Sequence, residues 1–369
     1  MLTKAFRNLL LCIIALASTY AFSEEPPSLK DFKSVYAEYQ KFSEAGEWSQ
    51  SLRPAKSSYE IGEQLFGEDS KNTAALTYNY GFNLMQLGNN DEAEKILKLA
   101  LKRFERTHGE NSEELVPLLM DLGFSMAEPY QKAKQKKYYN RALRLVESHY
   151  GEESLEYAQR SLEAGIHLLN KAQSMKAKSY LYKAHELFEA KLGQKAPRAG
   201  YAAFHIGKYE LATKDYKDAI RYFNKALVSF TVQDEPSNKL ELSTHGFLVE
   251  AYERLDESDK ATRHCLAIGR MTPATAVQDY QPLVKVAPIY PRSAQLHGSE
   301  GYVILEYEVD DFGFVRNPQV VDLGGPQSFA DVAIKAAKKF RYAPSFRDGK
   351  AVTTSGVQNK FIFSLANKR

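Results

Sequence analysis

The eight histidines are the residues most able to bind a metal ion or to move a proton, and their spacing indicates neither activity. No two of them form an HExxH or HxH pattern, the spacings that bring imidazoles together on one metal ion. We expect His185 to be a packed residue of a helix core and His108 to be solvated. The sequence therefore predicts no catalytic residue, no metal site and no cofactor. The full set is His108, His149, His167, His185, His205, His245, His264 and His297.

Acidic pairs and a glycine run also have structural explanations. Asp310-Asp311 reads as a turn and Glu152-Glu153 as a helix start, where carboxylates stabilise the local backbone. The run Gly324-Gly325-Pro326 lacks the spaced glycines and the lysine of a phosphate-binding loop. We therefore predict that the chain is not an enzyme and has no small-molecule substrate, with an enzyme kept as the residual alternative.

The clearest internal pattern is a period of 42 residues. Glycines and alanines recur in register, and a large or apolar residue stands three positions before each alanine. Such a period indicates stacked helix pairs, in which small residues let two helices approach closely. The series are Gly81, Gly123, Gly165 and Gly207; Ala100, Ala142, Ala184 and Ala226; and Leu97, Tyr139, Leu181, Phe223 and Cys265.

Within one unit, Gly81-x-x-Leu84-x-x-x-Gly88 followed by Ala93-x-x-x-Leu97-x-x-Ala100-Leu101 resembles the tetratricopeptide repeat (TPR). The resemblance implies an α-solenoid over residues 28–270, with a degenerate first unit from Asp31 to Phe66 and a last unit from Ser243 to Arg270. We expect Pro129 to end or kink one helix. A fourth glycine series is expected just past one helix of each unit, with a serine starting the next helix. These positions are Gly67, Gly109, Gly151 and Gly193, with Ser70, Ser112 and Ser154.

In TPR families the first helix of each unit lines the concave surface, and the aligned glycines carry that role over to specific positions here. Most of these positions are apolar or aromatic, which favours a groove for an apolar peptide or helix. Packing within the chain explains the same residues, and the sequence leaves both alternatives open. The expected groove residues are Ala75, Tyr78, Phe82, Met85, Met120, Phe124, Leu162, Ile166, Leu169, Tyr201 and Phe204, with the polar Lys33, Gln40, Ser243, Glu250 and Glu253 in the outer units.

The last quarter of the chain has a different pattern. Apolar residues alternate with mostly charged ones, which indicates a strand. The apolar positions are Val303, Leu305, Tyr307 and Val309, and the residues between and after them are Ile304, Glu306, Glu308 and Asp310. A turn at 310–313 and a strand from Phe314 to Leu323 complete a hairpin. A helix capped by Ser328 and a closing strand from Phe361 to Leu365 follow.

The motifs of this quarter resemble the TonB C-terminal domain in their identity and order. They are a YP-x-x-A opening, a G-x-x-G-x-V entry to a strand, a DDFG turn and an aromatic-R-Y-x-P exit from a helix. The fold class is therefore α+β multidomain: a TPR-like α-solenoid followed by a small α/β domain with a three-stranded antiparallel sheet and one main helix. The residues that carry the resemblance are Tyr290, Pro291, Gly298, Gly301, Gly313, Tyr342 and Pro344.

The TonB resemblance implies that an extended peptide pairs with an edge strand of the sheet. The family's strand order places the second and last strands at the two edges, and Pro318 blunts the second. Ala287 stands where the family commonly has glutamine, so one side-chain contact to the peptide is in doubt. The expected binding strand is Gln358, Asn359, Lys360, Phe361, Ile362, Phe363, Ser364 and Leu365.

Residues 1–23 are predicted to be a cleaved secretory signal. Lys4 and Arg7 precede an apolar run that ends at Phe22, which is too short to cross a bilayer. Lipidation at Cys12 is not expected. Cleavage of the signal removes Cys12 and leaves Cys265 without a disulfide partner. The net charge of +3 is small, and it suggests neither nucleic acid nor an acidic membrane as a partner. A periplasmic location is therefore expected.

These expectations combine into a periplasmic adaptor associated with TonB-dependent outer-membrane transport. Its expected partners are TonB-system or outer-membrane receptor proteins, with cell-wall or envelope proteins as further candidates. A short linker, residues 271–283, joins the repeats to the C-terminal domain at 284–369 and is too short to carry force from a membrane motor. The alternatives are a membrane-anchored TonB-type energy transducer with an uncleaved N-terminus and a cell-envelope scaffold.

Overall fold

The computed structural model describes residues 27–126, 132–170, 174–231, 239–272 and 280–365. The predicted signal segment and most of the predicted linker lie outside these ranges. The chain divides into two compact units, Met1–Glu110 and Asn111–Arg369, and each is described separately.

The first unit consists of helices that pack on one another in chain order. Gly67 ends α2 with a φ of +81°, and the Ser70 side chain accepts the backbone N–H of Thr73 at the start of α3, as the sequence predicts. The buried Arg103 side chain donates to Thr77 Oγ1 over 2.7 Å and pairs with Glu63. The helices are α1 (Leu29–Glu44), α2 (Trp48–Phe66), α3 (Lys71–Gln86) and α4 (Asn90–His108).

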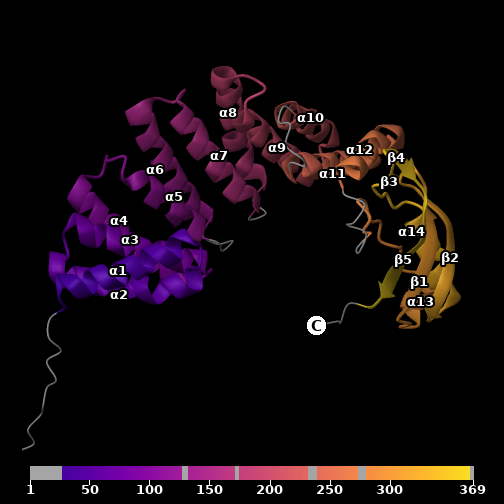
Figure 1. Cartoon of the computed structure of the whole chain (residues 1–369), viewed down its shortest axis with the longest axis horizontal. Coiled ribbons are helices and arrows are strands. Elements are labelled where there is room, and N and C mark those ends of the chain that lie inside the picture. The colour runs from indigo at the N-terminus through magenta and orange to yellow at the C-terminus, as the bar shows by residue number, and fades with distance from the viewer. Residues whose placement is uncertain (1–26, 127–131, 171–173, 232–238, 273–279, 366–369) are drawn as a thin grey trace, which may run out of the picture. The chain divides into compact units, whose positions relative to one another are not determined.

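The second unit continues the helical repeats and ends in the sheet (Figure 1). Pro117 lies in the first turn of α5, where its missing N–H costs no helix bond, and α5 ends at Ser125; Pro129 is outside the described residues. Ser112 precedes α5 by more than one residue and is not its cap, which corrects that expectation. The helices are α5 (Leu115–Ser125), α6 (Lys132–Tyr150), α7 (Leu155–Asn170), α8 (Ser174–Leu192), α9 (Pro197–Ala212), α10 (Tyr216–Phe230), α11 (Lys239–Glu253) and α12 (Ser258–Met271).

The periodic glycines lie against the second helix of their unit and leave no room for a side chain. A Cβ at Gly123 would lie 2.4 Å from the Tyr139 ring, and one at Gly207 would lie 2.6 Å from the Phe223 ring. Gly81 meets Leu97 and Gly165 meets Leu181 in the same way. In these four units the large residue therefore packs directly on the glycine of the same unit.

The C-terminal part is a three-stranded antiparallel sheet in the order β2-β1-β5, with α14 packed against it (Figure 1). Val303, Leu305, Tyr307 and Val309 are all buried, as their alternation predicts, and the rings of Phe329 and Phe363 stack 4.1 Å apart in the core. The elements are α13 (Arg292–Leu296), β1 (Gly301–Val309), β2 (Val315–Gly324), α14 (Gln327–Ala337), β3 (Ser345–Arg347), β4 (Lys350–Val352) and β5 (Thr354–Phe363).

Two local features of this part differ from the sequence expectation. The cap of α14 is Pro326, in extended conformation, so Ser328 lies inside the first turn and is not the cap. Pro326 starts the helix because its fixed φ leads into the first turn, where the Pro326 carbonyl accepts the N–H of Phe329. A short hairpin of β3 and β4 was not predicted, because strands of three residues show no alternation.

Candidate functional site

Strand β5 lies at one edge of the sheet and pairs on one side only among the described residues. Its partner is β1, with Gly301 opposite Phe363 and Tyr302 opposite Ile362. The observed order confirms that the last strand is an edge strand. Its other side presents backbone groups that a further strand can pair with.

The predicted binding residues divide between the two faces of β5 and the segment after it. Phe361 and Phe363 are buried in the core and cannot contact a ligand with their side chains. Gln358 and Lys360 are exposed, and 72% of the Ile362 surface is exposed. Asn359 is half-buried on the core side, while Ser364 and Leu365 follow the end of the strand, where Leu365 donates its N–H to Glu300 Oε1 over 2.6 Å.

Neighbouring side chains fix the exposed face of β5. Gln358 Nε2 donates to Glu306 Oε2 over 2.7 Å, and the Lys360 ammonium lies 4.5 Å from the centre of the Tyr302 ring. On the opposite face, Asn359 Oδ1 accepts a hydrogen bond of 3.1 Å from Lys285 Nζ. These contacts fix the side chains of the strand, and no other described strand pairs with its outer backbone edge.

The opposite edge, β2, is less regular. Pro318 lies within the strand and lacks an N–H, and the preceding Asn317 has a φ of +50°. The pairing of β2 with β1 shifts register twice, at Ile304/Leu305 and between Glu306 and Glu308. This irregular edge is a poorer template for an added strand than β5.

The residues that carry the TonB resemblance have structural roles. A Cβ at Gly313 would lie 2.1 Å from the Tyr342 carbonyl oxygen, and one at Gly301 would lie 1.8 Å from the Gly324 carbonyl oxygen, so only glycine fits at either position. The ring of Tyr290 packs edge-on against Phe363, and Gly298 has a φ of +64°. Pro291 precedes α13, Tyr342 is buried beside Tyr307, and Pro344 is buried as well.

The first helices of the repeats place few of the expected groove residues at the surface. Met85 in the first unit is buried, as are Met120, Leu162 and Phe204 in the second. Packing within the chain accounts for these four. Tyr201 is 37% exposed and Ala75 is exposed, and the half-buried residues are Tyr78, Phe82, Phe124, Ile166 and Leu169.

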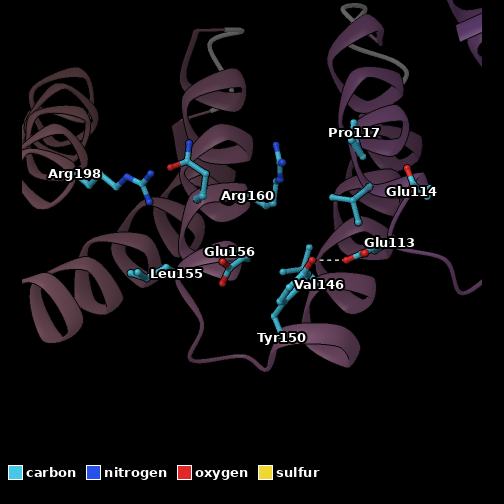
Figure 2. A pocket seen from close by; sticks show the side chains of 11 residues that line it. Glu113, Glu114, Pro117, Val146, Tyr150, Leu155, Glu156, Arg160 and Arg198 are labelled. Carbon is cyan, nitrogen blue, oxygen red and sulfur yellow. Dashed lines mark hydrogen bonds between the residues drawn. The ribbon is translucent and has the colours of Figure 1, made fainter. Parts of the chain in front are cut away.

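A hollow of about 410 Å³ lies over the starts of α5 and α7 in the second unit. Figure 2 shows the hydrogen bond between Tyr150 and Glu113 at one end of it and Arg198 at the other. Arg160 also lines the hollow and pairs with Glu163 over 2.8 Å. The hollow therefore has Glu113 and Glu114 on the α5 side, Glu156 together with Arg160 on α7, and Arg198 on α9.

A second hollow, of about 340 Å³, adjoins the first, since Gln159 and Arg198 line both. Leu162, Tyr201 and Leu240 give it an apolar lining. The groove residues predicted from the sequence include Tyr201 and Leu162 but not Arg198 or Gln159. Each of these stands three positions before a predicted residue, on the same helix face, and that spacing could have revealed them.

The histidines are spread over the described part of the chain, and two of them meet. Within the described ranges, no three side chains of the types that ligate metals come together. His245 and His264 meet through their Nδ1 atoms at 2.8 Å, and burial lowers the pKa of both, that of His264 to about 4. His185 is buried, as expected, whereas the expected solvated His108 is half-buried, stacked on Phe104.

No helix in the described residues is long and apolar enough to cross a membrane.

Comparisons with known proteins agree with this architecture. Residues 286–365 match the family model of the C-terminal region of the Gram-negative bacterial TonB protein, and residues 72–148 match a tetratricopeptide-repeat model. The TonB protein of Pseudomonas aeruginosa is 30% identical over 91 residues, which cover 25% of this chain and 26% of that protein. The match thus spans about a quarter of the length of this curated relative.

Three solved structures are similar to this chain at low sequence identity. BtubC from P. vanneervenii has a TM-score of 0.49 and 16% identity, covering 70% of this chain and 99% of that one. The assembly chaperone of RpL4, Acl4, has a TM-score of 0.43 and 14% identity, covering 66% and 92%. A Rap protein complexed with the competence and sporulation factor has a TM-score of 0.39 and 16% identity, covering 66% and 76%.

The family-model matches therefore identify residues 286–365 as a TonB C-terminal domain that follows a tetratricopeptide-repeat region.

Proposed function

We propose that this chain is a periplasmic adaptor associated with TonB-dependent outer-membrane transport. The TonB C-terminal and TPR domains are both interaction domains and indicate a role in the bacterial cell envelope. The adaptor binds an extended peptide segment of an outer-membrane receptor or TonB-system protein along β5. Its repeats bind a second partner, and the chain carries out no catalysis.

The observation that carries this proposal is the free edge of β5. Strand addition requires an unpaired and regular strand edge, and β5 has both properties over residues 357–363, beyond the irregularity at Gly356. Ala287, at a position where the TonB family commonly has glutamine, lacks an amide side chain that could contact the peptide but leaves the backbone pairing available. Backbone pairing supplies affinity in this mode, so the proposal does not depend on the missing glutamine.

Amide hydrogen exchange of the whole chain, with and without peptides from receptor N-terminal segments, tests strand addition. Bound peptide should slow the exchange of alternate β5 amides, because those N–H groups then donate to the peptide. A folded Ile362→Pro variant provides the mutational arm and is expected to lose affinity. Slowed exchange on the repeats without slowed exchange on β5 would move the site away from the sheet.

A second candidate surface is supported by the adjoining hollows on α5, α7 and α9. Tyr201 and Arg198 present an apolar and a cationic group side by side, a combination that suits a peptide with an apolar residue next to an acidic one. A photo-crosslinking amino acid at Tyr201 should capture a partner in the cell envelope. The same amino acid at exposed Leu192, which lines neither hollow, is the matched control.

Periplasmic location rests on the predicted signal, whose residues 1–23 lie outside the described part of the chain. Intact-mass measurement of the mature protein should give a chain that starts at about Glu24, in the soluble periplasmic fraction. A full-length mass in the membrane fraction would favour the anchored energy transducer instead.

A further inference from the structure

Within the second unit, a third cavity of about 700 Å³ lies between the last helix pair of the repeats and the TonB C-terminal domain. Arg254 lines it from the end of α11. Lys338 and Lys339 line it from the end of α14, and Lys285 lines it from the segment that precedes the domain. Three separate parts of the chain thus direct cations to one cleft.

Most of this positive charge is not neutralised among the described residues. Lys338 and Lys339 are exposed and make no ion pair there, and Lys285 bonds only the neutral Asn359. Arg254 pairs with Glu250 over 3.5 Å at the surface. The helix dipole explains the lysines at the end of α14, but it does not explain why Lys285 and Arg254 converge on the same space.

The carboxylates that line the cleft offset little of this charge. Glu253 is already bound to Arg341 Nη1 over 2.7 Å and accepts the Ser258 hydroxyl. Asp256 is the other acidic lining residue. The cleft therefore retains an excess of cations that is complementary to an anionic ligand.

One end of the cleft lies beside the edge strand. Lys285 lines the cleft and also donates to Asn359 Oδ1 on β5 over 3.1 Å. The Lys285 ammonium also lies 6.0 Å from the ring centre of Phe340, which follows the end of α14. A peptide that pairs with β5 would thus pass next to the cationic cleft.

We propose that this cleft binds an acidic segment, rich in aspartate or glutamate, that adjoins the part of the peptide paired with β5. The inference rests on the proposed function and adds a charge requirement to it. Lys338, Lys339 and Lys285 attract the carboxylates, while β5 binds the neighbouring backbone. The adaptor thereby selects acidic extended segments over neutral ones.

The test compares two fluorescent peptides with the same extended core, one flanked by aspartate and glutamate and the other by asparagine and glutamine. Binding to the full chain is measured by anisotropy. Lys338→Gln/Lys339→Gln should weaken the acidic peptide by about three- to tenfold and leave the neutral peptide unchanged. Added salt should reduce the preference for the acidic peptide.

Lys335→Gln is the matched control, because this exposed lysine lies on the same helix and does not line the cleft. Equal weakening of the acidic peptide by the control, or equal binding of both peptides to the unsubstituted chain, would overturn the inference. Binding with slowed β5 exchange but no charge preference leaves strand addition intact and rejects the cleft. Charge-dependent binding without slowed β5 exchange supports the cleft and rejects strand addition, and no binding of either peptide rejects both.

Discussion

The guanidinium of Arg341 donates to Glu253 Oε1 over 2.7 Å and thereby joins the TonB C-terminal domain to the last helix pair of the repeats. The same guanidinium donates to Thr262 Oγ1 over 2.8 Å and lies 3.7 Å from the centre of the Phe314 ring. Only 1% of the Arg341 surface is exposed. The domain is therefore anchored to the repeats by a buried charged pair as well as by the chain connection.

Arg341→Met should lower the free energy of unfolding by about 3 kcal/mol, because it leaves Glu253 as a largely buried charge without its partner. Urea denaturation measures this change. Arg341→Met/Glu253→Gln should recover part of the loss, since the second substitution removes the unpaired charge.

Arg221→Met is the control for this pair. Arg221 pairs with Asp218 on the surface over 3.1 Å, and such pairs contribute less than about 1 kcal/mol. A cost of Arg341→Met no larger than that of the control would show that the buried pair does not anchor the domain.

The anchor illustrates what the sequence could not predict. The aromatic-R-Y-x-P motif marks Arg341, but its partner Glu253 stands 88 positions earlier. No local pattern links the two residues. The end of the predicted linker also makes contacts that no local pattern indicates. The Tyr280 hydroxyl donates to the Ala343 carbonyl over 2.7 Å, and the Leu283 N–H donates to the Arg341 carbonyl over 2.7 Å.

Local patterns were read correctly where the physical cause is local. The contact of Gly123 with Tyr139 follows from the antiparallel packing of two adjacent helices, which repeats with every unit. The alternation in β1 follows from a sheet with one buried face. The sequence did not predict which residues of the repeats are exposed. Phe204 and Tyr201 are both aromatic residues at expected groove positions, but the first is buried and the second is exposed.

The glycine register gives a second prediction. Gly123→Ala should destabilise the repeats by about 1 to 3 kcal/mol, because the new Cβ would lie 2.4 Å from the Tyr139 ring. Thermal unfolding followed by circular dichroism measures the change. Gly123→Leu should cost at least as much.

Gly246→Ala provides the same substitution in an open place. Gly246 lies within α11, and a Cβ there meets no atom within 4 Å. It should stabilise the protein by about 0.5 to 1 kcal/mol through a better helix propensity. A shift of the same sign in both variants would contradict the predicted close contact at Gly123.

The buried histidines predict a loss of stability in acid. Burial lowers the pKa of His205 and of His264 to about 4, below the ordinary value of 6.5. The unfolded chain therefore binds protons more readily, so stability is fully present above pH 6.5 and is lost as the pH falls toward 4. The melting temperature should decrease over this window.

His264→Gln should reduce the dependence of the melting temperature on pH, because it removes one of the buried groups that titrate. The exposed His297 gives the control substitution, His297→Gln. Identical acid dependence in the two variants would show that the His245–His264 contact does not contribute.

Cys265 should resist thiol reagents while the protein is folded. Its side chain is fully buried between α12 and the C-terminal domain, and burial raises the pKa of the thiol to about 11, although the adjacent Arg341 partly opposes this shift. The reactive thiolate is therefore scarce at neutral pH, and the sulfur is also inaccessible. A chain that begins at Glu24 contains no other cysteine, so the rate of labelling by a thiol reagent reports this site alone. We expect negligible labelling at pH 8 and complete labelling in denaturant. Because the pKa of the Cys265 thiol is higher in the folded than in the unfolded chain, the stability linked to this thiol is present below about pH 9 and is lost as the pH rises toward 11.

Arg341→Met should accelerate labelling of Cys265 by loosening the contact that covers the sulfur, whereas Arg221→Met should not. Rapid labelling of the folded, unsubstituted chain would contradict the buried contact between the last helix pair and the C-terminal domain.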